Sequence, residues 1–125
     1  MKFFLDKQER YTLMKIQEEN LNAALAPQLK SELVVLANEG VPNLIIDLSE
    51  VKYVDSSGLS AILTADRLWK SGTFVLTGVQ SDAVRKLIEI SRLDTVLNII
   101  PTVEESIDFI FMEEIERQLK QEEED

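Results

Sequence analysis

The chain has 125 residues, of which 45% are hydrophobic and 29% charged, and its formal net charge is −10. This length suits one domain with one core, and the acidic balance argues against nucleic acid and against direct membrane binding. The chain has neither cysteine nor histidine, which excludes disulfides, thiolate metal sites and Ser-His-Asp catalysis. No apolar run is long enough to span a bilayer or to form a signal peptide, so we expect a cytoplasmic protein. We also expect no cofactor and no metal.

The first elements predicted from the sequence form an antiparallel hairpin. Residues 3–5 are a short apolar run and residues 11–16 alternate roughly with period two, on either side of a polar turn. An amphipathic helix is expected next, over residues 27–39. Pro27 suits its first turn, and Gly40 suits a left-handed position after its last turn.

Strands and helices alternate through the rest of the chain. Residues 44–48 are almost continuously apolar, which suits a central strand covered on both faces. Further strands are expected over residues 73–77 and 96–100, and further helices over residues 57–70, 82–92 and 103–117. The sequence therefore predicts an α/β domain with a mixed, mostly parallel sheet.

Several finer features accompany these elements. Ser81 or Asp82 is expected to cap one helix, and Thr102 with Glu105 forms a capping box at the start of the last. Six apolar side chains are predicted to be buried, namely Leu44, Ile46, Leu63, Val75, Leu87 and Ile107.

The last predicted helix ends in a strongly acidic segment. Its apolar face is expected to consist of Val103, Ile107, Ile110 and Phe111. Phe109 and Met112 lie off that face, either padding the edge of the core or contacting a partner. Residues 113–125 hold seven acidic and two basic side chains, which is typical of a solvated helix end or tail. We therefore divide the chain into a domain, residues 1–112, and a tail, residues 113–125.

The stretch Asp55-Ser56-Ser57-Gly58-Leu59 lies where the chain leaves the central strand and a helix begins. Such a junction has unpaired N–H groups and the positive end of the helix dipole, which favour a phosphate on a nearby hydroxyl. Ser and Asp are also the commonest N-cap residues, so the motif by itself favours a plain helix cap. Position makes Ser56 the expected phosphate acceptor and Ser57 the expected cap.

The run from Leu44 to Leu59, with the pattern LIIDLSxVxxVDSSGL, resembles the signature of STAS domains, in particular the bacterial anti-sigma factor antagonists. Leu21-Asn22 before the first helix and residues 72–78 and 84–104 supply further matching landmarks. The resemblance extends from the first strands to about Phe111. It implies the STAS fold, in which an N-terminal hairpin joins a mixed, mostly parallel sheet and about four helices.

The resemblance implies a binding protein, not an enzyme. An unphosphorylated antagonist binds an anti-sigma factor that is itself a serine kinase, and thereby releases the sigma factor. The kinase phosphorylates the first Ser after the Asp of the motif, here Ser56, and a serine phosphatase removes the phosphate. The implied partner-binding residues, in a protein that is a monomer or weak dimer, are Asn22, Asp47, Asp55, Ser56, Ser57, Gly58 and Leu59.

Two other functions remain open on the sequence. The chain could be a STAS regulatory subunit of a membrane lipid-transport ATPase complex, although such members often lack a phosphorylatable Ser in the motif. It could also be an enzyme that uses Asp47 and Asp55 as a carboxylate pair or a cation site. No phosphate-binding loop and no nucleophile–base pair in the sequence supports the enzyme.

Overall fold

The computed structural model describes residues 1–124. Its strands are β1 (Phe3–Lys7), β2 (Thr12–Ile16), β3 (Asn20–Leu21), β4 (Asn43–Asp47), β5 (Tyr53–Val54), β6 (Thr73–Thr77) and β7 (Asn98–Ile100). Its helices are α1 (Ala26–Asn38), α2 (Ser56–Leu68), α3 (Asp82–Ile90), the short 3-10 helix η1 (Leu93–Thr95) and α4 (Val103–Glu124).

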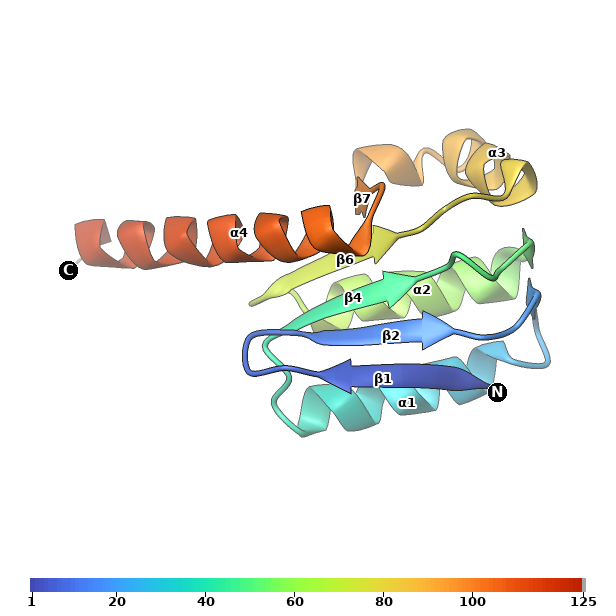
Figure 1. Cartoon of the computed structure of the whole chain (residues 1–125), viewed down its shortest axis with the longest axis horizontal. Helices are drawn as coiled ribbons and strands as arrows, with labels where there is room; N and C mark the ends of the chain where they lie inside the picture. The colour runs from blue at the N-terminus through green and yellow to red at the C-terminus, as the bar shows by residue number, and fades with distance from the viewer. Residues whose placement is uncertain (125) are drawn as a thin grey trace.

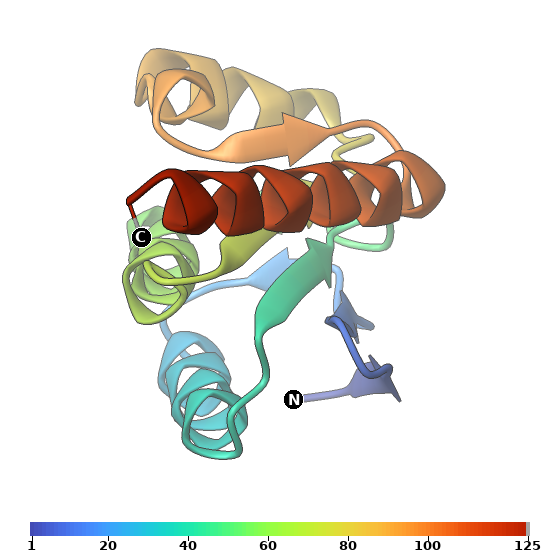
Figure 2. The same ribbon diagram turned by 90° about the vertical axis from the view of Figure 1, so that its left-hand side faces the viewer.

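Five strands form one sheet in the order β1-β2-β4-β6-β7. β1 and β2 are antiparallel, and the other neighbouring pairs are parallel, so the predicted mixed α/β sheet is confirmed. Helices α1 and α2 cover one face, while α4 crosses the other face and runs past the edge where the parallel strands begin (Figures 1 and 2). The short strands β3 and β5 form a separate parallel pair, which the sequence did not predict.

The core has two parts, one on each face of the sheet. The larger lies between the sheet and helices α1 and α2, and it includes Leu44 and Ile46 of β4. The smaller lies under α4 and is built around Ile45, Val75 and Ile110. Because both faces are covered, all five residues of β4 are buried, as predicted for a central strand.

Most of the predicted details hold. Leu44, Ile46 and Val75 are fully buried, whereas the remaining three predicted core residues are only partly buried against the two cores, namely Leu63, Leu87 and Ile107. Gly40 has φ of +83°, the left-handed conformation expected after a helix end. The caps of α3 and α4 are also confirmed, since the hydroxyls of Ser81 and Thr102 accept hydrogen bonds from the backbone N–H groups of Val84 and Glu105.

Helix α4 differs from the prediction in two respects. It continues to Glu124, seven residues beyond the predicted end, while Asp125 lies outside the described residues. Its apolar face was predicted wrongly at Phe111, which is 41% exposed, whereas Phe109 pads the smaller core, one of the two alternatives expected for it. Phe111 rests edge-on against Tyr11, the residue before β2, with ring centroids 6.5 Å apart. On this face of the sheet, opposite α1, no helix of residues 1–124 covers β1 and β2 (Figure 2).

Across residues 1–124, none of the helices combines the length and the apolar character needed to cross a bilayer.

Candidate functional site

The Asp55–Leu59 motif is anchored by the small β3–β5 pair. Leu21 of β3 pairs with Val54 of β5, and the N–H of Asp55 donates to the carbonyl of Leu21 at 3.2 Å. This pairing brings the loop that contains Asn22 against the start of α2, although the two segments are more than thirty residues apart. Asn22, one of the partner-binding residues that the resemblance implied, therefore lies in a loop beside the motif.

Asp55 caps helix α2. One of its carboxylate oxygens accepts from the N–H of Gly58 at 2.9 Å, and the other accepts from the N–H of Ala23 at 3.1 Å. The side chain thus closes the first turn of α2 and ties it to the Asn22 loop. The prediction that Ser57 is the cap is wrong, because α2 begins at Ser56, one residue earlier than expected, and this places Ser57 inside the first turn.

The two serines differ in exposure. Ser56, the first residue of α2, is exposed, and its hydroxyl has no hydrogen-bond partner within residues 1–124. Ser57 is half-buried and lines a shallow hollow between α1 and α2. Lys30 of α1 reaches the same hollow, and its ammonium group donates to the hydroxyl of Ser60 at 3.2 Å. No pattern in the sequence pointed to Lys30, since its position beside the serines depends on the packing of α1 against α2.

Gly58 and Leu59 hold the first turn of α2 in place. A Cβ atom on Gly58 would lie 2.3 Å from the carbonyl oxygen of Leu21, so only glycine lets the helix approach β3 this closely. The side chain of Leu59 is 8% exposed and turns into the larger core. These two residues therefore fix the position of the first turn of α2, which carries the exposed Ser56.

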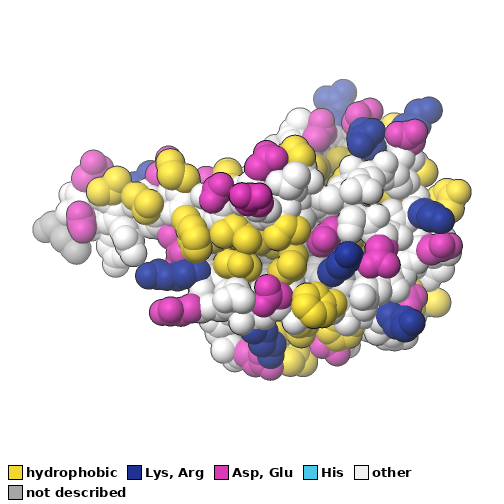
Figure 3. Space-filling model, viewed as in Figure 1, with side chains coloured by type: hydrophobic (Ala, Val, Ile, Leu, Met, Phe, Trp, Pro, Cys, Tyr) yellow, Lys and Arg dark blue, Asp and Glu magenta, His cyan; other side chains and the backbone are white. Residues whose placement is uncertain are grey.

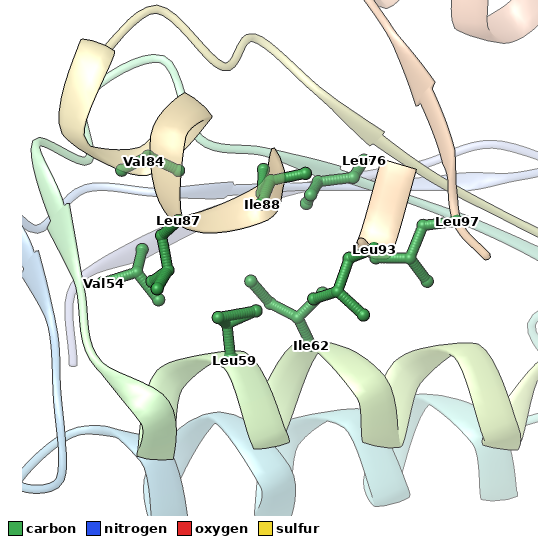
Figure 4. Close-up of a pocket in the computed structure, with 9 residues that line it drawn as sticks. All are labelled: Val54, Leu59, Ile62, Leu76, Val84, Leu87, Ile88, Leu93 and Leu97. Carbon is green, nitrogen blue, oxygen red and sulfur yellow. The ribbon is translucent and has the colours of Figure 1, made fainter. Parts of the chain in front are cut away.

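The core next to Leu59 contains a small cavity between α2 and α3 (Figure 4). Nine apolar side chains line it, namely Val54, Leu59, Ile62, Leu76, Val84, Leu87, Ile88, Leu93 and Leu97. Its volume is about 10 Å³, the lower limit for holding one water molecule. The cavity is a gap in packing and is too small for a ligand.

The other two predicted site residues make local hydrogen bonds. The side-chain oxygen of Asn22 accepts from the N–H of Ala24 at 3.0 Å. Asp47, at the end of β4, is 8% exposed and accepts from the N–H of Ser49 at 2.8 Å. Asp47 therefore stabilises its own loop, whereas Asp55 joins two segments, and among residues 1–124 no cluster of three possible ligands could hold a metal ion.

The fold and this site define a small α/β domain that presents a serine at a helix start beside the ends of its parallel strands. A family model described as "Mlab, STAS domain" matches residues 4–101. The chain therefore belongs to the STAS domain family, and the resemblance inferred from the sequence is confirmed.

Solved structures of similar fold include three bacterial proteins. An anti-sigma factor antagonist from Mycobacterium paratuberculosis is 22% identical, with 87% of this chain and 92% of that chain covered and a TM-score of 0.78. The Bacillus cell fate determinant SpoIIAA in its phosphorylated form is 22% identical, with 87% and 99% covered and a TM-score of 0.66. An RsbS variant from Moorella thermoacetica is 22% identical, with 94% and 99% covered and a TM-score of 0.73. At this level of identity the likeness establishes the fold.

Proposed function

We propose that this protein is a phosphorylation-controlled binding module of the anti-sigma factor antagonist type. In its unphosphorylated form it binds an anti-sigma factor that is a serine kinase, and the sigma factor is released. Phosphorylation of Ser56 ends this binding, and a serine phosphatase restores it. The observation that carries the proposal is the exposed hydroxyl of Ser56 on a helix whose cap is supplied by Asp55.

The geometry supports a switch that leaves the fold intact. A phosphate adds a charge of about −1.5 to −2. The start of α2 tolerates that charge, because the helix dipole is positive there and the ammonium group of Lys30 lies in the adjacent hollow. A partner surface that fits the uncharged serine would meet two adjacent negative charges, the phosphate and the exposed carboxylate of Asp55. Repulsion between these charges and acidic groups on the partner would weaken the complex.

The proposed binding surface divides into contacting and supporting residues. Ser56, Ser57 and Asp55 are accessible at the start of α2, and the Asn22 loop lies beside them. Gly58 and Leu59 hold these positions from the buried side, and Asp47, the remaining residue of the proposed surface, is 8% exposed and stabilises its own loop. The similarity in fold to an anti-sigma factor antagonist and to a cell fate determinant in its phosphorylated form supports the proposal.

The test is a phosphorylation assay with an anti-sigma factor kinase from the source cell. The wild type, Ser56→Ala and Ser57→Ala are incubated with the kinase and ATP, and the modified residue is located by mass spectrometry. We expect phosphate on Ser56 in the wild type and in Ser57→Ala, and none on Ser56→Ala, which should still bind the kinase. Phosphate on Ser57 in the wild type, or equal labelling of Ser56→Ala, would contradict the assignment.

A second candidate function is favoured by the description of the family model, which names Mlab. In that case the protein is a STAS regulatory subunit of a membrane lipid-transport ATPase complex, and the surface around Ser56 contacts the ATPase. Affinity capture with the wild-type protein separates the two functions. A serine kinase lost on Ser56→Glu supports the first function, and a transporter ATPase supports the second.

A further inference from the structure

Helix α4 carries a row of exposed apolar side chains at a distance from the serine site. Phe111, Met112, Ile115 and Leu119 are between 41% and 61% exposed, and we call them the α4 stripe. Their spacing of one, three and four residues places them on one side of a helix, over about two turns. Figure 3 shows hydrophobic side chains gathered along α4 and on the sheet beside it.

The α4 stripe is held in a fixed position by the opposite side of the helix. The guanidinium group of Arg117 donates to the hydroxyl of Thr73 at 2.8 Å and to the side-chain oxygen of Asn43 at 3.3 Å. Glu114 forms an ion pair with Arg10 at 3.6 Å. Thr73 and Asn43 are the first residues of β6 and β4. Helix α4 is therefore attached where the parallel strands begin, at the opposite end of the sheet from the start of α2.

Acidic residues surround the α4 stripe. At 100° per residue, Asp108 precedes it and Glu122 follows it on the same side of the helix, with Glu116 at its flank, and all three are exposed. Residues 103–124 contain nine acidic and two basic side chains, a net charge of −7 out of −10 for the chain. Neither basic side chain, Arg117 or Lys120, lies on the side of the stripe.

The acidic residues around the α4 stripe indicate which kind of partner can bind it. A second copy of the chain would bring an equally acidic helix against the first in either orientation, and like charges at close range oppose association. An anionic lipid surface would be repelled in the same way. A segment with an apolar face and Lys or Arg at its edges would cover the stripe and pair with the acidic frame.

We propose that the α4 stripe is a docking site for a basic amphipathic helix of a partner protein, distinct from the surface around Ser56. The recognition is that of two helices packed along their apolar faces, with ion pairs at the rim. The partner helix needs about three turns to match the stripe and its acidic ends. The inference does not depend on the proposed phosphorylation.

The test uses a synthetic helical peptide with leucines on one face and lysines at its edges, and the full chain as the receptor. Fluorescence anisotropy should detect binding that weakens as salt rises. The double variant Ile115→Ser/Leu119→Ser should weaken binding about tenfold or more, because two apolar contacts are lost. Ile90→Ser is the matched control, since Ile90 is 73% exposed on α3 and its replacement should leave the affinity unchanged.

Two further measurements complete the test. A peptide with glutamates in place of the lysines should not bind, and Asp108→Asn/Glu122→Gln should weaken binding of the lysine peptide and reduce its dependence on salt. Equal affinity of the wild type and the double variant would overturn the proposal. So would an equal loss in Ile90→Ser, or sedimentation of the wild type as a dimer that the double variant abolishes, since the occupant would then be a second copy.

Discussion

Two substitutions of Asp55 should show how much each of its two hydrogen bonds contributes to the free energy of unfolding. In Asp55→Ala, the N–H groups of Gly58 and Ala23 both lose their acceptor. Loss of a helix cap costs about 1 kcal/mol, and loss of the second hydrogen bond costs about 1 kcal/mol more, because the exposed N–H group can bind water instead. Asp55→Asn keeps the oxygen that caps Gly58 but turns an amide NH₂ group toward Ala23, so it should cost only about 1 kcal/mol.

These costs are measurable by thermal and urea unfolding. In a domain of this size, 1 kcal/mol lowers Tm by about 4 °C, so we expect decreases of about 8 °C for Asp55→Ala and about 4 °C for Asp55→Asn. Ser57→Ala is the matched control, with an expected change within about 0.5 kcal/mol, since Ser57 is not the cap. A larger loss in Ser57→Ala than in Asp55→Ala would refute the assignment of the cap. A wild-type Tm for Asp55→Asn would mean that the bond to Ala23 contributes nothing.

Three other changes have clear expected results. Gly58→Ala should lower the free energy of unfolding by about 2 kcal/mol or more in urea titration, because the added Cβ would overlap the carbonyl of Leu21; an unchanged midpoint would contradict the close approach of the two segments. Arg117→Ala should lower it by about 1 kcal/mol, since the hydrogen bond to Thr73 that holds α4 is lost; if the free energy did not change, α4 would not be anchored there. Deleting residues 118–125 should lower Tm by no more than about 2 °C in calorimetry, because residues 118–124 are exposed and bury almost no apolar surface; a large decrease would mean that this end docks on another surface.

The spacing of apolar residues, together with glycines and prolines at the ends of elements, was sufficient to predict the five-stranded sheet and its helices. The unbroken apolar run of β4 identified a central strand, and Gly40 marked the end of α1. The pair of β3 and β5 was missed because each strand has only two residues, too few for any alternation to be visible. The end of α4 was also missed. Its acidic segment has few apolar residues to show a helical pattern, and the contact of Arg117 with Thr73 that holds the helix is not visible in the sequence.

The site was predictable in its composition but not in its contacts. The motif from Asp55 to Leu59 identified a helix start with a candidate acceptor serine. Which residue caps the helix depended on a shift of one residue in where α2 begins, and boundaries of this kind are the least reliable part of a prediction from sequence. The contact from Asp55 to Ala23 and the place of Lys30 depend on the packing of α1 against α2, which local pattern does not encode.

The corrected cap makes the chemistry of Ser56 easier to understand. If a serine hydroxyl had capped α2, phosphorylation would convert the capping group itself into a bulkier, charged phosphate ester, so one group would serve both the fold and the modification. Asp55 performs that task instead, with both carboxylate oxygens bound to backbone N–H groups, so the Ser56 hydroxyl is not needed for the structure. A charge added there acts on whatever is bound to the surface, while the helix dipole offsets part of it within the protein. The division of tasks between adjacent residues would therefore allow the proposed phosphorylation of Ser56 to change binding without changing the fold.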